Sequence, residues 1–314
     1  MNSVLPSEFC FIERGWLNAN NVIVHAHGAP AIVDTGHLYC ADETIDLIRA
    51  NGFDPTEIGQ IAITHAHSDH HGGNRKLMSL SGAPVAMGSL TAEWFARGER
   101  HLTWFDQMSQ EVDVIPADII YHEGDIVDLG GMPFQVVSLP GHGMDTVGYF
   151  QPDTRVMICA DAMWHNDTGM LHTQVHGWDI IDDAELALRR ILDLDVLVAI
   201  PGHGGLITNV AENAGNALQR LQSFRDEPAR LAWHIIRRFY VYGVLRYQPI
   251  PASEYQAQVL DDGWLAYYCK IINESADKGQ QYSPPQLANR LLHEFKARDI
   301  VREEDGFLSC DLRR

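Results

Sequence analysis

Short runs of apolar, often β-branched residues recur along the first two-thirds of the chain, and each ends in a polar or glycine-containing turn. Runs of this kind predict buried strands. Strands are predicted at 21–33 (two strands joined by a turn), 61–63, 85–88, 119–121, 134–137, 156–159 and 196–200. Apolar residues at helical spacing lie between them, at 42–50, 74–80, 91–110 and 182–193. This alternation indicates an α/β fold.

Beyond residue 208 the pattern changes to long amphipathic segments. Helices are predicted there at 210–225, 229–247 and 286–298. The last of them is followed by a strand-like wing at 299–308, so that the end of the chain resembles the outline of a winged helix. We therefore expect two units, residues 1–208 and a helix-rich extension over 209–314. The extension would cover a pocket or form an oligomer contact such as a homodimer.

The predicted strands end in residues that bind metals. Residues 61–73 read Ile-Ala-Ile-Thr-His-Ala-His-Ser-Asp-His-His-Gly-Gly, so that one tight turn carries His65, His67, Asp69 and His70. Later strands each deliver one further candidate: His142, Asp161 and His203. Imidazole and carboxylate together suit zinc, manganese or iron better than calcium or magnesium. The sequence thus predicts a metal site built from loops at strand ends.

Composition limits the class of protein and its partners. A chain of 314 residues, 46% of them apolar and seven of them tryptophan, can bury a large core. Lys and Arg number 23 against 42 Asp and Glu, and the resulting net charge of −19 repels phosphate backbones. Nucleic acid is therefore not the expected main partner.

The five cysteines are scattered and form no Cys-x-x-Cys pair, which is typical of a reducing compartment. The first residues have no basic segment followed by an apolar one, and no run approaches the roughly 18 apolar residues that span a bilayer. We expect a cytoplasmic protein without a membrane segment.

Taken in order, the motifs resemble those of the metallo-β-lactamase fold superfamily, the αβ/βα hydrolases. The resemblance covers about residues 18–208. It rests on five segments: Asp34-Thr35-Gly36, Thr64 to Gly73, Pro140-Gly141-His142-Gly143, Cys159-Ala160-Asp161 and Pro201-Gly202-His203-Gly204. It implies a four-layer αβ/βα sandwich with two divalent ions, zinc first and iron or manganese as alternatives.

The resemblance also implies how the ligands divide. One ion would be held by His65, His67 and His142, the other by Asp69, His70 and His203, and Asp161 would bridge both. Asp69 would in addition accept the proton of the attacking water. Asp34 and His71 are expected beside the ligands without binding a metal themselves. Gly143 stands where many relatives carry Thr or Ser, a departure that removes no ligand.

Substrate contacts are predicted in the loop after Asp161, which combines aromatic and hydrogen-bonding side chains. The candidates are Trp164, His165, His172 and His176. The alternative is a surface loop held down by its aromatic residues, and the sequence does not separate the two.

The resemblance implies a dinuclear metal hydrolase that uses a hydroxide between the ions on a small molecule. A thioester, ester or lactone is our first expectation, as in hydroxyacylglutathione hydrolases and acyl-homoserine lactonases. A phosphodiesterase would need cations that the motif loops do not supply, and a hydrolytic dehalogenase of an aromatic compound would use the same chemistry. A different class remains open, a sensor that binds a metabolite in the metal pocket.

Overall fold

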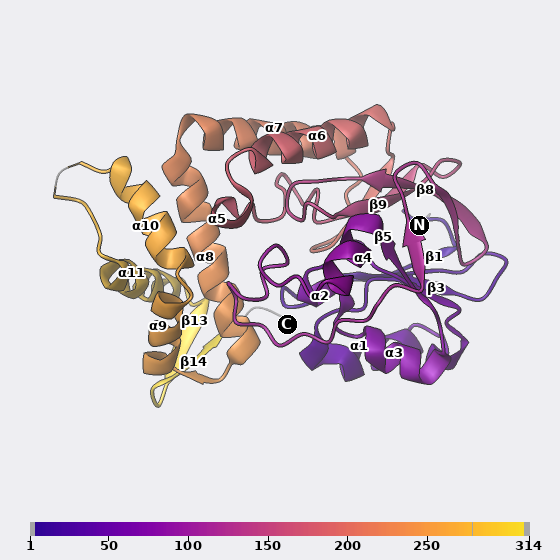
Figure 1. The fold of residues 1–314 in the computed structure, drawn as a ribbon, viewed down its shortest axis with the longest axis horizontal. Coiled ribbons are helices and arrows are strands. Elements are labelled where there is room, and N and C mark those ends of the chain that lie inside the picture. Colours follow the sequence, from indigo (N-terminus) through magenta and orange to yellow (C-terminus); the bar gives the residue numbers. More distant parts are fainter. Residues whose placement is uncertain (1–3, 278, 311–314) are drawn as a thin grey trace.

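The computed structural model of the protein describes residues 4–277 and 279–310. Two β-sheets lie face to face, with helices on the outer side of each (Figure 1). The first sheet has the order β1-β2-β3-β4-β5-β6, formed by Phe9–Ile12, Asn21–Val24, Ala31–Val33, Gln60–Ala62, Val85–Gly88 and Ile119–Tyr121. The second has the order β11-β10-β9-β8-β7, and β7 to β11 are Ile126–Leu129, Met132–Ser138, Val147–Gln151, Val156–Ala160 and Val198–Pro201.

Alternating side chains build the layers. Val22 and Val24 of β2 pack between the two sheets, whereas Ile23 packs against the helices outside the first sheet. That face is covered by α1 (Ala41–Ala50), α3 (Asn74–Ser81) and α4 (Ser89–Ala96), while α6 (Ile180–Asp193) covers the second sheet. The predicted four-layer αβ/βα sandwich is confirmed.

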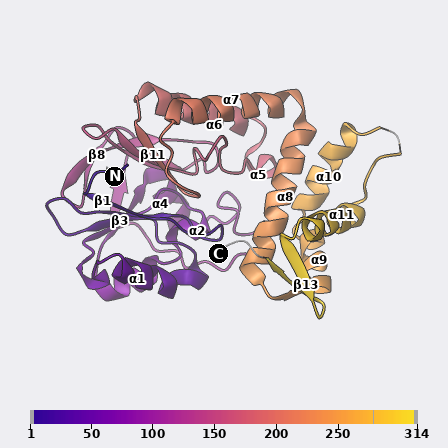
Figure 2. The same cartoon turned by 180° about the vertical axis from the view of Figure 1, so that it is seen from behind.

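The C-terminal part forms a helical lobe beside the sandwich, seen from both sides in Figures 1 and 2. Its helices are α8 (Pro228–Tyr247), α9 (Ala252–Asp261), α10 (Trp264–Glu274) and α11 (Pro284–Ala297). Helix α7 (Val210–Asp226) lies along α6 and leads into α8 (Figure 1). A small sheet of order β12-β14-β13 accompanies the helices of the lobe, with Ile250–Pro251, Phe307–Cys310 and Val301–Glu304 in that order. Helices followed by two antiparallel strands match the predicted winged-helix outline. No helix among the described residues is both long and apolar enough to span a bilayer.

The lobe shares its apolar core with the sandwich. One continuous cluster of buried side chains runs from Met157 of β10 through Ile181 of α6 and Leu221 of α7 to Trp264 of α10. The core therefore does not break at residue 208, and the boundary between the two units stays a prediction.

The helix predicted over 91–110 is wrong in its length. Helix α4 ends at Ala96, and Gly98 follows with a positive φ of 67°. Its N–H bonds back to the carbonyl of Phe95, an arrangement that glycine favours just after a helix end. The rest of the predicted helix forms turns. This end lets the aromatic residues after it fold over the metal-binding loop.

Candidate metal centre

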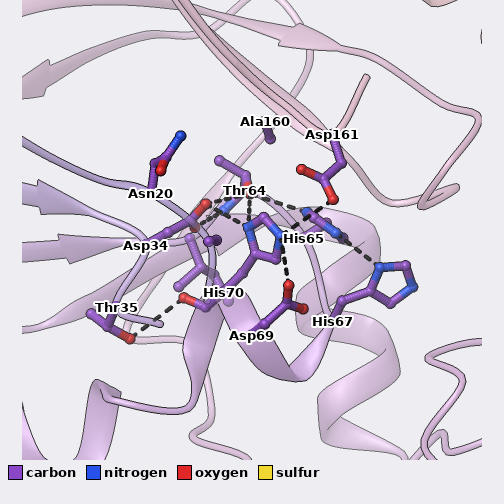
Figure 3. Close-up of polar contacts among 12 residues, drawn as sticks. Asn20, Asp34, Thr35, Thr64, His65, His67, Asp69, His70, Ala160 and Asp161 are labelled. Carbon is purple, nitrogen blue, oxygen red and sulfur yellow. Dashed lines mark hydrogen bonds and ion pairs between the residues drawn. The ribbon is translucent and has the colours of Figure 1, made fainter. Parts of the chain in front are cut away.

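The ends of four strands bring the predicted ligands to one buried place. His65, His67, Asp69 and His70 follow β4, the last two in the short helix α2 (Ser68–His71), and Asp161 follows β10 (Figure 3). His142 follows β8 and His203 follows β11. Each of the seven predicted ligands is at most 9% exposed. Their ligand atoms form three groups, each within 4.8 Å: His65 with His67 and His142, His65 with His70 and Asp161, and Asp69 with His70 and His203. The first and third groups contain the residues that the resemblance assigns to the two ions, and Asp161 lies near both; their role as ligands stays a prediction.

In the first group three imidazole nitrogens face one another. The Nδ1 atom of His67 lies 3.0 Å from Nε2 of His65 and 2.8 Å from Nε2 of His142. A single ring nitrogen cannot serve both neighbours with one hydrogen or one lone pair. A cation held between the three nitrogens would satisfy all of them.

In the second group carboxylates face imidazoles. The Oδ2 atom of Asp69 lies 3.1 Å from Nε2 of His203 and 3.8 Å from Nε2 of His70. Oδ2 of Asp161 lies 3.3, 3.7 and 3.6 Å from the Nε2 atoms of His142, His70 and His203. Asp161 thus has one oxygen within reach of both groups.

In His70 and His142, a neighbouring oxygen determines which ring nitrogen points to the centre. Nδ1 of His70 lies 2.7 Å from Oδ2 of Asp34, and Nδ1 of His142 lies 2.8 Å from the carbonyl of Met170. Each Nδ1 therefore donates its hydrogen outward, which leaves the Nε2 lone pair of the neutral ring facing inward. Nε2 of His70 is buried without a hydrogen-bond partner among the described residues. Inward lone pairs and carboxylates on buried side chains fit divalent metal ions.

The charges of the centre are coupled. Burial disfavours a charged His70, yet the carboxylates of Asp34 and Asp69 outweigh it and hold the pKa of His70 well above its ordinary value. Burial alone would raise the pKa of Asp161, but His203 and His70 keep it below its ordinary value. Since a metal ligand must be deprotonated, metal binding should release protons from this centre.

The backbone around the centre is specialised. Asp34 has a φ of 59° and Ala160, just before Asp161, a φ of 48°, both unusual for residues other than glycine. A Cβ atom on Gly202 would lie 2.0 Å from Oδ1 of Asp161, so that glycine is required there. Strained positions of this kind cluster at functional sites.

Replacing Asp34 with alanine should weaken metal binding by about 10- to 100-fold, because His70 would lose the partner that orients its ring. Competition with a chromophoric chelator would measure the affinity. The matched control is Asp46→Ala on α1, whose side chain is 77% exposed. Equal affinities of the two variants would contradict the role of Asp34.

The predicted motifs also match at the level of families. The model of the Metallo-beta-lactamase superfamily matches residues 14–203, well over half of the chain. The chain belongs to the metallo-beta-lactamase superfamily. The match ends at the last predicted ligand, so the family region contains every metal-binding candidate.

Curated relatives of this superfamily member include hydroxyacylglutathione hydrolases. The protein from Ectopseudomonas mendocina is 28% identical over 142 residues, which is 45% of each chain. That from Pseudomonas putida strain GB-1 is 32% identical over 117 residues, 36% of this chain and 37% of the relative. The chain thus spans less than half the length of these relatives.

A solved structure extends the likeness to the C-terminal lobe. A metallo-beta-lactamase family protein from Thermus thermophilus has a TM-score of 0.60 and 17% identity, and covers 99% of this chain and 100% of its own. At that identity the likeness shows the fold alone.

A cavity of about 480 Å³ lies over the metal centre of this superfamily member. The ligands His67, Asp69 and His142 form part of its wall, and the apolar side chains of α8 face them. Helix α8 contributes Phe239, Val241, Tyr242 and Leu245. The volume is that of a small-molecule site.

Of the four residues predicted to contact a substrate, only Trp164 lines the cavity. Trp164 lines the cavity and donates a hydrogen bond from Nε1 to Oδ1 of Asp161, 3.0 Å away. His165 instead lies 3.0 Å from the carbonyl of Gly205, outside the cavity wall. His172 is fully buried against Tyr268 of α10, and His176 accepts a hydrogen bond from Trp104. The two histidines therefore stand behind the wall and support it.

His71 lies next to the ligands but packs against aromatic rings. Both of its ring nitrogens are buried without a hydrogen-bond partner among the described residues. The ring contacts Phe95 and Phe105, with centroids 5.0 and 6.0 Å away. It belongs to none of the three groups of ligand atoms, so it acts as packing beside the centre.

Several wall residues escape prediction from the sequence. Trp16 stacks on His203 at 5.8 Å, and Trp104 covers His67 at 4.2 Å between ring centroids. Three arginines from the lobe also line the cavity: Arg237, Arg238 and Arg298. A signal for two of them was the Arg-Arg pair within an otherwise apolar helix, but the pattern alone does not show what that pair faces.

Buried histidines should make the protein sensitive to mild acid. Burial lowers the pKa of His172 to about 3, whereas an unfolded histidine titrates near 6.5. Below about pH 6.5 the unfolded chain therefore binds a proton at His172 that the folded chain does not bind. As the pH falls, the free energy of unfolding decreases by about 1.4 kcal/mol per pH unit for this residue. His172→Gln should flatten this loss between pH 6 and 4, measured by urea unfolding in the presence of a chelator.

His122→Gln is the control for that experiment, because the His122 side chain is 67% exposed. This variant should keep the slope of the unmodified protein. A slope that His172→Gln leaves unchanged would show that other groups cause the loss.

Proposed function

We propose that the protein is a metal-dependent hydrolase of acyl compounds, that is, a thioester, ester or lactone. The observation that carries this proposal is the position of Asp69, whose carboxylate belongs to a group of ligand atoms and also lines the cavity. A group that is both buried with histidines and open to a substrate can serve the reaction directly. The relatives named hydroxyacylglutathione hydrolase support an acyl substrate.

Bound divalent ions would supply a nucleophile from water at neutral pH and polarise the carbonyl oxygen of the substrate. His65, His67 and His142 would hold one ion, Asp69, His70 and His203 the other, and Asp161 would contact both. Two metal ions, zinc first, are part of this proposal.

The histidines beside Asp69 keep its carboxylate in the form that the reaction needs. The pKa of Asp69 lies below its ordinary value, because His70 and a hydrogen bond from His203 outweigh the effect of burial. The carboxylate is therefore ionised and can accept the proton of the attacking water. The oxygen of that water forms a bond to the acyl carbon, and the bond from this carbon to sulfur or oxygen breaks. The departing sulfur or oxygen takes up the proton that Asp69 accepted, and in a lactone it stays attached to the opened chain.

The cavity wall suits the acyl part of such a substrate. Trp16, Trp104 and Trp164 surround the ligands, and α8 adds an apolar face opposite. These side chains would bind a carbon skeleton and keep bulk water away from the reacting carbonyl. We infer an acyl group that is aromatic or branched aliphatic.

A second candidate is a phosphodiesterase. It is favoured by the three arginines of the cavity wall, because guanidinium groups bind phosphate oxygens in bidentate pairs. These cations come from the C-terminal lobe and not from the motif loops.

A substrate panel tests the proposal. The protein loaded with zinc, and separately with manganese, is offered thioesters, lactones and bis-p-nitrophenyl phosphate, with Asp69→Ala as control. Turnover of an acyl compound that the control lacks would support the proposal, and turnover of the phosphodiester alone would replace it. A protein that matches its control throughout, yet melts at higher temperature with one of these compounds, would be a metabolite-binding sensor instead.

A further inference from the structure

A second cavity lies beside the first. It has a volume of about 580 Å³ and is formed by α7, α8 and the loop that follows Trp164. We call it the basic groove, and define it by Arg220, Arg230, Arg237, Arg238, His234 and Asn166. Arg237 and Arg238 line both cavities, so that their side chains form the partition between the groove and the metal pocket.

The arginines around the partition outnumber their carboxylate partners. Oδ2 of Asp167 lies 2.8 Å from Arg238 and 3.5 Å from Arg220. The carboxylate of Glu294 is likewise shared, 2.8 Å from Arg237 and 3.5 Å from Arg298. Two carboxylates therefore serve four guanidinium groups, which leaves an excess of two positive charges.

The remaining groups of the groove do not cancel this excess. Burial keeps the pKa of His234 well below its ordinary value, so the ring is neutral. Arg230 pairs with Glu227 at 2.8 Å, but both side chains are more than half exposed, and such a pair is easily exchanged for another partner. The groove is thus a basic surface with polar amides and a hydroxyl at its edge.

This surface stands out from the rest of the chain. Residues 228–298 contain nine of the 23 Lys and Arg but six of the 42 Asp and Glu. This stretch is therefore positive in a protein whose net charge is −19, while residues 209–314 as a whole balance 14 Lys and Arg against 14 Asp and Glu. A local positive field on an acidic protein favours a small anion over an extended polyanion, which the remaining surface would repel.

We propose that the basic groove binds a phosphate group on the non-acyl part of the substrate. This proposal rests on the function proposed above, and it narrows the substrate to an acyl thioester or ester whose leaving group carries phosphate. The acyl carbon would lie at the metal centre, and the leaving group would cross the partition at Arg237 and Arg238. Guanidinium groups suit this role because their planar N–H pairs match phosphate oxygens.

The test compares two thioesters with the same acyl group, benzoyl-coenzyme A and the phosphate-free benzoyl-N-acetylcysteamine. The zinc-loaded protein should have a kcat/KM at least about tenfold higher for the first, since one charge-assisted contact is worth about that factor. In the double variant R220Q/R230Q, which changes residues of the groove alone, this preference should fall about tenfold. R49Q on α1 removes an arginine whose side chain is 57% exposed, as that of Arg230 is, and should keep the preference.

A binding measurement makes the result independent of turnover. Desulfo-coenzyme A, which lacks the thiol, should bind the unmodified protein more tightly than R220Q/R230Q in calorimetry, and added salt should weaken it. Inorganic phosphate should bind much more weakly than this probe. If phosphate binds as tightly, the groove holds a free anion and the proposal is wrong.

The outcomes separate the two proposals. Hydrolysis of both thioesters with equal kcat/KM would overturn the phosphate-binding role and leave the hydrolase standing. An equal loss of both activities in R220Q/R230Q would show that the arginines act on the fold. If the protein hydrolyses neither these thioesters nor any other acyl compound of the panel, the proposed function fails. Equal binding of desulfo-coenzyme A by the variant would overturn the role of the groove.

Discussion

Replacing Asp161 with alanine is expected to lower the metal content from about two ions per chain to one or fewer, and hydrolysis by at least about a thousandfold. The reason is its position, with Oδ2 between 3.3 and 3.7 Å from the Nε2 atoms of His142, His203 and His70. Losing this carboxylate removes a ligand from both groups at once. It also leaves buried imidazoles without the negative charge that compensates a cation.

Elemental analysis after dialysis against zinc measures the metal content, and a thioester assay measures the rate. Asp153→Ala is a matched control, because Asp153 lies in the exposed turn between β9 and β10, away from the centre. Two ions per chain in Asp161→Ala would refute the position assigned to this residue.

Replacing Asp69 with asparagine is expected to lower kcat by about 10²- to 10⁴-fold, the range for loss of a general base. Asparagine has nearly the same shape and can still bind a metal weakly through its oxygen, but it cannot accept the proton of water. KM should change much less than kcat, because the apolar cavity wall stays intact.

The metal content of this variant decides how the loss is read. A rate that falls while at least one ion per chain is retained indicates proton transfer, and a parallel loss of both indicates a ligand role alone. Asp106→Asn, an exposed residue of the loop after α4, is the control. A kcat for Asp69→Asn equal to that of the control would exclude Asp69 from the reaction.

The meeting of the candidate ligands at one place was predictable because it depends on local sequence. His65, His67, Asp69 and His70 lie within six residues of one strand end, and the later ligands each follow an apolar strand and a glycine turn. Strand ends of a twisted sandwich meet at one edge, so the order of motifs along the chain was enough. The same reasoning predicted Asp34 beside the ligands, where it accepts the Nδ1 hydrogen of His70.

The cavity wall could not be predicted because it depends on packing between distant segments. Trp104 reaches His67 from a turn in which its own φ is 62°, where the sequence indicated a continuous helix. His172 seemed suited to contact a substrate, but Tyr268 of α10, 96 residues later, packs against it. The spacing of apolar residues does not reveal which distant side chain will cover a histidine.

The surroundings of the cavity arginines were likewise not predictable from the sequence. Arg237 and Arg238 lie next to each other in α8, and a pair of charges in a helix is usually solvated. Here both arginines line the cavity, and Arg238 is held by the carboxylate of Asp167, 2.8 Å away. The net charge of the whole chain therefore does not predict the charge of this one local surface.

The continuous core that joins the lobe to the sandwich has a consequence for how such enzymes diversify. The ligands lie within residues 65–203, whereas much of the cavity wall comes from α8 and α11. Mutations in the lobe can therefore reshape substrate choice while the reactive centre is inherited unchanged. The shared core limits this freedom, because each substitution must also keep the packing of the buried cluster that runs from Met157 of β10 to Trp264 of α10.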